Sequence, residues 1–213
     1  MLIKKYFAIF YKKIVHMNFL AHAYLSFNHP EILVGNIISD FVKGKKKFEY
    51  SQGIQQGIFL HRQIDLFTDD HEATKEARKF LKPAVGLYSG AFVDVAYDHF
   101  LANDINEFTD DSLRDHALYT YDVLMKYYPV LPASFQTMLP FMQSQNWLYN
   151  YRNLTGTQSS FGGVVKRAKY LYSSREVFDL FQENYNSLQQ CYETFFPFLK
   201  EFSLLQFKQL TNK

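Results

Sequence analysis

Helical periodicity dominates this sequence from Asn18 to the C-terminal end. Apolar residues recur about every three to four positions, the spacing that places them along one face of an α-helix. Signals for β-strands are sparse, because no Asn-Gly or Asp-Gly pair marks a hairpin and no segment sustains an apolar–polar alternation. With 213 residues, 47% of them hydrophobic, the chain can build one packed core without a second domain. The sequence therefore predicts an all-α fold consisting of a single helical domain.

Proline, glycine and polar residues mark where the helices are expected to begin and end. Proline favours the first turn of a helix, and glycine favours the position just after its end. These signals predict helices over 18–27, 30–42, 51–67, about 70–82, 84–104, 110–127, 133–150, 158–172 and 174–210. Asp69 or Asp70 is expected to cap the fourth, which should end before Pro83, and Pro197 is expected to kink or break the last.

The first sixteen residues, MLIKKYFAIFYKKIVH, differ from the rest. They resemble a signal peptide only superficially, because Lys12 and Lys13 interrupt the apolar stretch and no small-residue cleavage site follows. We interpret residues 1–16 as an N-terminal extension, either an appended helix or the product of an upstream start codon, and 17–213 as the domain. A weak peripheral membrane contact through residues 1–16 stays open, whereas no segment is long and apolar enough to span a bilayer. Cys191 is the only cysteine, which fits a reducing cytoplasm.

Ionisable residues interrupt several otherwise apolar helical segments. These are His22 in NFLAHAYLSF, Asp40 in GNIISDFVKG, the three residues His61, Asp65 and Asp69 in GIFLHRQIDLFTDD, and Asp94, Asp98 and His99 in FVDVAYDHFLAND. Burying an unpaired carboxylate costs on the order of several kcal/mol, so such groups need a metal ion, a cationic partner or hydrogen bonds.

The spacing of these residues favours a shared metal site. His61 and Asp65 lie one helical turn apart, as do Asp94 and Asp98, so each pair projects from one face of its helix. A mixed imidazole and carboxylate set suits divalent Mn, Fe, Zn, Ni or Co better than Ca. Each residue also has a structural interpretation: a lone histidine is often part of the core, and Asp65 could pair with Arg62. A single metal centre explains why acids and imidazoles occur in several apolar helices more simply than a separate structural role for each residue.

Two short basic runs stand out against a formal net charge of only +2. The balance is too close to neutral to indicate nucleic acid binding. The runs consist of Lys43, Lys45, Lys46 and Lys47, and of Lys166, Arg167 and Lys169. Such a run is commonly a solvated surface, but it could also attract an acidic partner. The remaining histidines, at 16, 29, 71 and 116, lie in polar or terminal settings and are expected at the surface.

Four motifs in order resemble the acyl carrier protein phosphodiesterase family, which is regarded as a divergent branch of the His-Asp (HD) metal-dependent phosphohydrolases. They are MNFLAHAYLSF at 17–27, GNIISDFVKG at 35–44, GIFLHRQIDLFTD at 57–69 and DVAYDHFLA at 94–102. The resemblance extends from Met17 almost to the C-terminus, including the region around Trp147, Tyr151 and Arg167. It implies an HD-like helical bundle.

The resemblance further implies a hydrolase that removes 4′-phosphopantetheine from holo acyl carrier protein with a divalent metal ion. Mn²⁺ is the expected ion, with Fe²⁺, Co²⁺, Mg²⁺ and Zn²⁺ as alternatives. The expected metal ligands are His22, Asp40, His61, Asp98 and His99. Arg62 and Arg167 would offset charge on the phosphoryl oxygens, and Asp40, Asp65, Asp69 and Asp94 would take the remaining catalytic roles, orienting histidines or carrying protons. Lys43, Lys45, Lys46 and Lys47 would bind the acidic carrier protein.

Two other functions stay open. An HD-type phosphohydrolase acting on a nucleotide or another small phosphoester would use similar residues, although the chain has neither a P-loop nor a GxGxxG motif. A non-catalytic helical module that binds carrier protein or membrane would need no metal ion. Metal analysis and a substrate panel separate these three functions.

Overall fold

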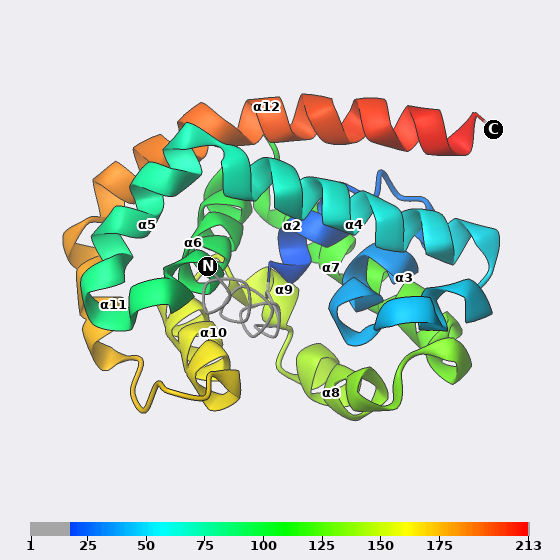
Figure 1. The fold of residues 1–213 in the computed structure, drawn as a ribbon, viewed down its shortest axis with the longest axis horizontal. Helices are drawn as coiled ribbons and strands as arrows, with labels where there is room; N and C mark the ends of the chain where they lie inside the picture. The colour runs from blue at the N-terminus through cyan, green and yellow to red at the C-terminus, as the bar shows by residue number, and fades with distance from the viewer. Residues whose placement is uncertain (1–17, 213) are drawn as a thin grey trace, which may run out of the picture.

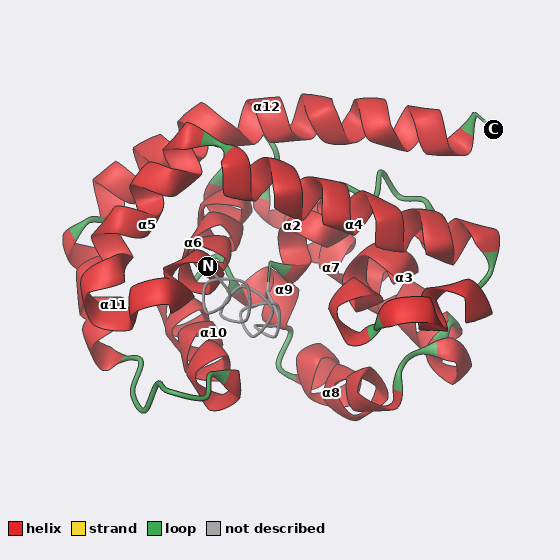
Figure 2. Cartoon of the chain, viewed as in Figure 1, coloured by secondary structure: helices red, strands yellow, loops and turns green. Residues whose placement is uncertain are grey.

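The computed structural model describes residues 18–212, which form helices joined by short loops, with no strand in this part of the chain (Figure 2). This confirms the prediction of an all-α, single-domain fold. Within residues 18–212, no helix combines the length and the apolar character needed to cross a bilayer. The expected extension over 1–16 lies outside the described residues, so it stays a prediction.

The helices follow one another with short connections (Figure 1). The α-helices are α2 (Phe19–Tyr24), α3 (Pro30–Ile38), α4 (Gln52–Asp70), α5 (Glu72–Val85), α6 (Ser89–Asn103), α7 (Asp110–Lys126), α8 (Ala133–Ser144), α9 (Trp147–Asn150), α10 (Leu154–Arg167), α11 (Arg175–Glu183) and α12 (Tyr185–Thr211). Short 3₁₀ helices are η1 (Ser39–Phe41), η2 (Gly44–Glu49), η3 (Gly86–Tyr88) and η4 (Tyr128–Val130).

Helix α6 lies at the centre of the fold. Its residues are apolar around the whole circumference, and every residue from Ala91 to Ala102 is buried, as expected for a helix with packing partners on all sides. It packs against α2, α5, α10 and α12. Helix α12 crosses over α4 and α5 along one side of the molecule (Figure 1). The acidic and imidazole side chains of α6 are therefore enclosed by other helices.

Helices α3 and α4 approach each other closely where two glycines face each other. A Cβ atom on Gly35 would lie 2.0 Å from the carbonyl oxygen of Ile54, and one on Gly57 would lie 2.2 Å from that of Ile32. No other residue type fits either position without moving a backbone. These two glycines begin the GNIISDFVKG and GIFLHRQIDLFTD motifs, so they bring the polar residues of both motifs within reach of each other.

Several helix boundaries differ from the prediction. The fourth predicted helix is capped by His71, whose Nδ1 accepts from the Ala73 amide, rather than by Asp69 or Asp70. Pro83 lies inside the last turn of α5, which ends at Gly86 with a φ of 56°.

The two longest predicted C-terminal helices are each interrupted. The segment 133–150 divides into α8 and α9 at Asn146, which has a left-handed φ of 45°. The segment 174–210 breaks at Asn184, not at Pro197, and α12 continues through Pro197. Packing of α12 against α4, α5 and α6 supports the helix on both sides of the proline.

Candidate metal centre

Two histidines and an aspartate from two helices meet in the interior. His22 comes from α2, and His61 and Asp65 come from adjacent turns of α4; their ligand atoms lie within 4.8 Å of one another. His22 Nε2 is 3.4 Å from Asp65 Oδ1, and His61 Nε2 is 3.2 Å from Asp65 Oδ2. The two imidazole rings stack at 4.0 Å between centroids. We refer to these three residues as the His22–His61–Asp65 cluster.

Asn36 of α3 orients both imidazole rings. Its main-chain oxygen lies 2.7 Å from His61 Nδ1, and its side-chain Oδ1 lies 2.7 Å from His22 Nδ1. A carbonyl oxygen can only accept, so both Nδ1 atoms carry a proton. The hydrogen bonds of Asn36 Nδ2, which donates to the His22 carbonyl and to Ser26 Oγ, fix which side-chain atom of Asn36 is nitrogen and which is oxygen. In the neutral rings each Nε2 therefore presents a lone pair.

Each ionisable side chain of the cluster shifts the pKa of the others. Burial and repulsion from His61 lower the pKa of His22. Burial by itself would also lower the pKa of His61, but the Asp65 and Asp40 carboxylates outweigh it and raise that pKa to about 10. Burial opposes ionisation of Asp65, yet His61 and His22 hold its pKa well below the ordinary value. The two carboxylates thus require a positive charge beside them, supplied by a proton on His61 or by a metal ion.

The free atoms of the cluster fit a metal ion. His22 Nε2 and His61 Nε2 are both buried, and neither has a hydrogen-bond partner among residues 18–212. Each of them lies beside an Asp65 oxygen, at 3.4 Å for His22 and 3.2 Å for His61. Two ligands bound at about 2.1 Å to one ion lie roughly 3.0 to 3.4 Å apart, depending on the angle between them. The His22–His61–Asp65 cluster could therefore hold a metal ion.

Asp40 and Arg167 lie at the edge of this cluster. Asp40, half-buried in η1, places Oδ1 3.5 Å from His61 Nε2. Arg167 occupies the C-terminal end of α10, where burial lowers the pKa of its guanidinium and attraction to Tyr151 and Asp40 opposes that shift. The Arg167 guanidinium thus interacts electrostatically with the carboxylate that lies beside His61.

Asp98 bonds away from the cluster, although it was expected to bind metal. Its Oδ1 accepts from the Ala21 amide at 2.9 Å and its Oδ2 from the Leu20 amide at 3.0 Å. Burial raises the pKa of Asp98 well above the ordinary value, and hydrogen bonds from these amides and from the Tyr151 hydroxyl oppose that shift. The structure does not bring Asp98 into the cluster, because its two oxygens are used by the backbone of α2.

His99, the neighbouring expected ligand, also bonds elsewhere. Its Nδ1 lies 2.7 Å from the carbonyl oxygen of Tyr151, and its Nε2 lies 2.9 Å from the Tyr185 hydroxyl. Thr157 Oγ1 is 3.1 Å from the same Nδ1. Both ring nitrogens are occupied, so His99 connects α6 to α9, α10 and α12 instead of joining the cluster.

The remaining expected catalytic residues lie around the cluster or away from it. Arg62 follows His61 on α4 and is half-buried. Asp94 is buried on α6, where its charge interacts with Asp98. Asp69 is exposed and forms an ion pair with Arg78 of α5, which ties the two helices together.

The lysine run follows Asp40 directly. Lys43 precedes η2, and Lys45, Lys46 and Lys47 lie within it; the side chains are exposed except for the half-buried Lys47. Lys47 also lies over the Phe48 ring at 4.9 Å. His116, in contrast, was expected at the surface but is half-buried in α7, where burial lowers its pKa to about 4.

Two features of the site were missed in the sequence. Asn36 was not considered, although an amide four residues before Asp40 in an otherwise apolar stretch was a usable signal. Asp65 was assigned to orienting histidines or carrying protons, whereas the structure places its two oxygens beside both imidazole rings. Spacing along one helix could not reveal that a histidine from α2 would face it.

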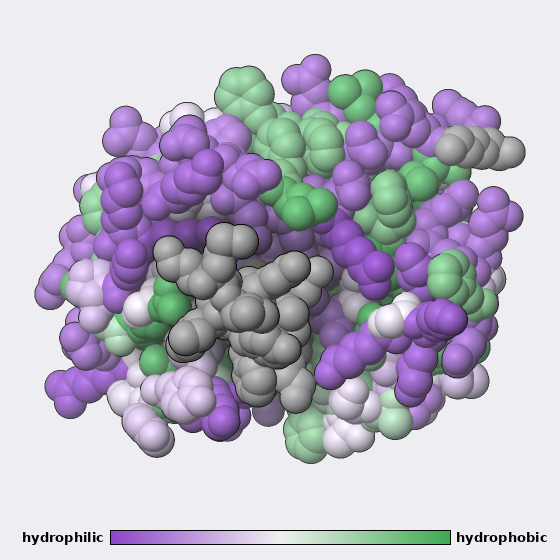
Figure 3. Space-filling view, viewed as in Figure 1, coloured by the Kyte–Doolittle hydropathy of each residue, from purple (hydrophilic) through white to green (hydrophobic). Residues whose placement is uncertain are grey.

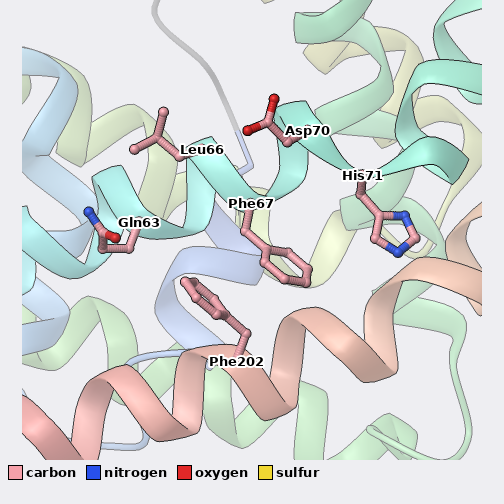
Figure 4. A pocket seen from close by; sticks show the side chains of 6 residues that line it. All are labelled: Gln63, Leu66, Phe67, Asp70, His71 and Phe202. Atoms are coloured by element: carbon pink, nitrogen blue, oxygen red, sulfur yellow. The ribbon is translucent and has the colours of Figure 1, made fainter.

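A surface pocket of about 310 Å³ lies between α4 and α12, away from the cluster. Gln63, Leu66, Phe67, Asp70, His71 and Phe202 line it, and the rings of Phe67 and Phe202 face each other (Figure 4). Helical geometry places Gln63 and Asp70 on the side of α4 opposite His61 and Asp65. Hydrophobic side chains also gather on the outer surface near α12 (Figure 3). This pocket is therefore separate from the candidate metal centre.

Comparison with known proteins agrees with the motifs. A family model described as acyl carrier protein phosphodiesterase matches residues 17–199. A relative of that name from Yersinia pestis is 31% identical over 182 residues, which cover 85% of this chain and 94% of that protein. Relatives of the same name from Klebsiella pneumoniae subsp. pneumoniae and Escherichia coli O45:K1 are 30% and 29% identical, covering 85% and 87% of this chain and 94% and 96% of theirs.

No solved structure matches the chain significantly, so the likeness to the HD fold stays a prediction. The family assignment does not depend on it. The model match spans most of the chain and includes all the residues of the candidate metal centre. The chain belongs to the acyl carrier protein phosphodiesterase family.

Proposed function

We propose that this protein hydrolyses holo acyl carrier protein to the apo form and 4′-phosphopantetheine, using a divalent metal ion held by His22, His61, Asp65 and Asp40. One observation carries this proposal. Two buried imidazole nitrogens, which have no hydrogen-bond partner in the described part of the chain, face two carboxylates, in a chain whose relatives are named acyl carrier protein phosphodiesterase. The ligand set differs from the sequence expectation by including Asp65 and omitting Asp98 and His99.

A bound divalent ion supplies Lewis acidity toward a phosphoryl oxygen and toward water. The surrounding side chains supply orientation and charge. Asp40, at the partly exposed edge, is placed to hold the attacking water and to accept its proton. Arg167, attracted by Asp40, would offset the charge that develops on the phosphoryl oxygens, with Arg62 as a second candidate for that role. Asn36 keeps both imidazole rings in the tautomer that binds a cation.

Mn²⁺ is the proposed ion. Imidazole and carboxylate ligands without a thiolate suit Mn²⁺ and Fe²⁺, and also accommodate Co²⁺ or Zn²⁺, whereas Mg²⁺ prefers oxygen ligands alone. Metal analysis of the purified full-length protein, followed by reconstitution of the metal-free form with each ion, identifies the ion that restores activity.

The decisive experiment incubates the protein with holo acyl carrier protein and Mn²⁺ and measures the intact mass of the carrier. We expect a mass loss equal to phosphopantetheine less one water, because hydrolysis adds a water molecule across the phosphodiester, and no loss with the folded variant His61→Ala or Asp40→Ala. His116→Gln is the matched control, because His116 is a half-buried histidine outside the cluster. An unchanged carrier with every ion, or hydrolysis of cyclic or linear nucleotides instead, would contradict the proposal.

The lysine run is the proposed binding surface for the carrier protein. Acyl carrier proteins are acidic, and the exposed lysines 43, 45 and 46 follow Asp40 directly. Reversing the charge of Lys45, Lys46 and Lys47 together should raise KM for the carrier protein while sparing hydrolysis of a small phosphodiester. Equal losses on both substrates would argue against docking at this surface.

A further inference from the structure

The helix that carries His22 cannot fix its own position. Helix α2 has only six residues, and helices shorter than about 12 residues are marginal without tertiary support. Its N-cap residue, Asn18, makes no side-chain hydrogen bond to the helix. The amide groups of its first turn therefore need an acceptor from another part of the chain.

Asp98 of α6 provides that acceptor from 78 positions away in the sequence. One carboxylate oxygen accepts from Leu20 and the other from Ala21, and the Asp98 side chain is fully buried. These two amides belong to the residues immediately before His22. The carboxylate thus occupies the position that a capping side chain would take at the start of a helix, and it fixes the backbone next to a cluster residue.

The other end of α2 is fixed separately. The His22 carbonyl oxygen accepts from Ser26 Oγ at 2.7 Å and from Asn36 Nδ2 at 2.9 Å. Asp98 and Asn36 therefore hold the backbone on both sides of His22, one from α6 and one from α3. Asn36 also bonds the His22 ring, whereas the hydrogen bonds of Asp98 to α2 go to backbone amides.

We propose that Asp98 is a positioning residue that sets the place of His22 in the metal centre through the backbone amides of Leu20 and Ala21. This inference rests on the proposed function, because it assigns His22 to metal binding. Losing the carboxylate would let α2 shift relative to α4, so that His22 Nε2 no longer faces the Asp65 oxygens. The ion would then keep His61, Asp65 and Asp40 but lose a well-placed fourth ligand.

The test compares Asp98→Asn with Phe92→Leu in the full chain. Asparagine keeps the volume and one acceptor but turns an amide toward the second backbone N–H. Phe92 lies on the same helix, fully buried against Phe161 of α10 at 5.0 Å between rings, and does not contact α2 through any hydrogen bond. Its truncation therefore controls for a general loss of α6 packing.

Two measurements decide the outcome. Calorimetric titration of the metal-free proteins with Mn²⁺ should show about a 10- to 100-fold weaker affinity for Asp98→Asn, the range seen when a residue supporting a metal ligand is lost. Phe92→Leu should bind Mn²⁺ like the wild type at a similarly lowered Tm. Hydrogen exchange followed by NMR should show faster exchange at the Leu20 and Ala21 amides in Asp98→Asn only.

An affinity of Asp98→Asn within twofold of the wild type, or an equal loss in Phe92→Leu, overturns the inference. If the wild type itself binds no Mn²⁺, the metal-dependent function fails instead. In that case the exchange rates, together with the NMR signal of the His22 Nδ1 proton bonded to Asn36, still decide whether Asp98 positions His22. Retention of that signal and of slow amide exchange in Asp98→Asn would then refute it.

Discussion

The His22–His61–Asp65 cluster and the Asp98–His99 pair both contain buried histidines beside an aspartate, but their polar atoms bond differently. In the cluster, both Nε2 atoms face carboxylate oxygens and lack a hydrogen-bond partner within the residues that the structure describes. In the pair, the two carboxylate oxygens accept from backbone amides and the two ring nitrogens bond to Tyr151 and Tyr185. Burial of acids and imidazoles therefore does not identify a metal site; free, convergent lone pairs do.

The largest expected effect is the loss of Mn²⁺ affinity when an aspartate of the cluster is removed. Asp65→Ala should weaken Mn²⁺ binding by more than about 100-fold, because Asp65 lies beside both imidazoles. This loss exceeds the roughly 10- to 100-fold effect of removing a residue that only supports a metal ligand. His116→Gln should retain binding. Calorimetric titration measures both, and tight Mn²⁺ binding by Asp65→Ala would break the distinction.

The contact between α3 and α4 gives the next effect. Gly57→Ala places a Cβ atom about where the Ile32 carbonyl now lies, so the helices must separate at a cost of about 3 kcal/mol, the upper range for overpacking. The separation should also weaken the bond between His61 and the Asn36 carbonyl. Thermal unfolding of the metal-free protein measures the loss.

Gly162→Ala is the matched control for that substitution. Gly162 also lies in a helix, but the nearest atom to its added Cβ is 4.0 Å away. Alanine there should stabilise the protein by roughly 0.5–1 kcal/mol through helix propensity. Equal destabilisation by both variants would show that glycine as such, rather than the close contact, matters.

A variant of the Asp98–His99 pair tests whether this pair contributes to stability without contributing to metal binding. His99→Leu removes the hydrogen bonds to the Tyr151 carbonyl and the Tyr185 hydroxyl, leaving that carbonyl only Thr157 Oγ1 at 3.4 Å, so it should destabilise the protein by about 2 kcal/mol. Because His99 does not reach the cluster, the folded variant should bind Mn²⁺ with unchanged affinity. Urea unfolding and titration at low temperature give both values, and loss of metal binding without loss of stability would place His99 in the site.

The smallest expected effect is the dependence of Mn²⁺ affinity on pH. In the metal-free protein the pKa of His61 is raised to about 10, so His61 is protonated at neutral pH, while burial keeps His22 neutral. Binding of an ion at His61 must displace that proton, and affinity should rise about tenfold per pH unit below pH 10, or about 1.4 kcal/mol per unit. Titrations between pH 6 and 8 in buffers of different ionisation enthalpy should show release of about one proton. A pH-independent affinity would mean that His61 is not a ligand.

Much of the fold followed from local sequence signals. Periodicity indicated helices throughout, and Pro30 at the first turn of α3 agreed with its expected role. Boundaries that depend on packing were missed: α12 continues through Pro197 because neighbouring helices support it, and a left-handed residue at Asn146 divides α8 from α9. Local rules describe what a segment prefers, whereas contacts with other helices decide where it ends.

By itself, the sequence determined the all-α class, the family motifs and the short set of buried acids and imidazoles from which a metal site could be built. Only the tertiary structure decided which of them converge, because a helical repeat tells which residues share a face but not which face of another helix it meets. The glycine contact between α3 and α4 brought Asn36 to His61, and the path of α2 brought His22 to Asp65. Asp98 and His99, equally apparent in the sequence, met backbone groups instead, and their hydrogen bonds are satisfied there.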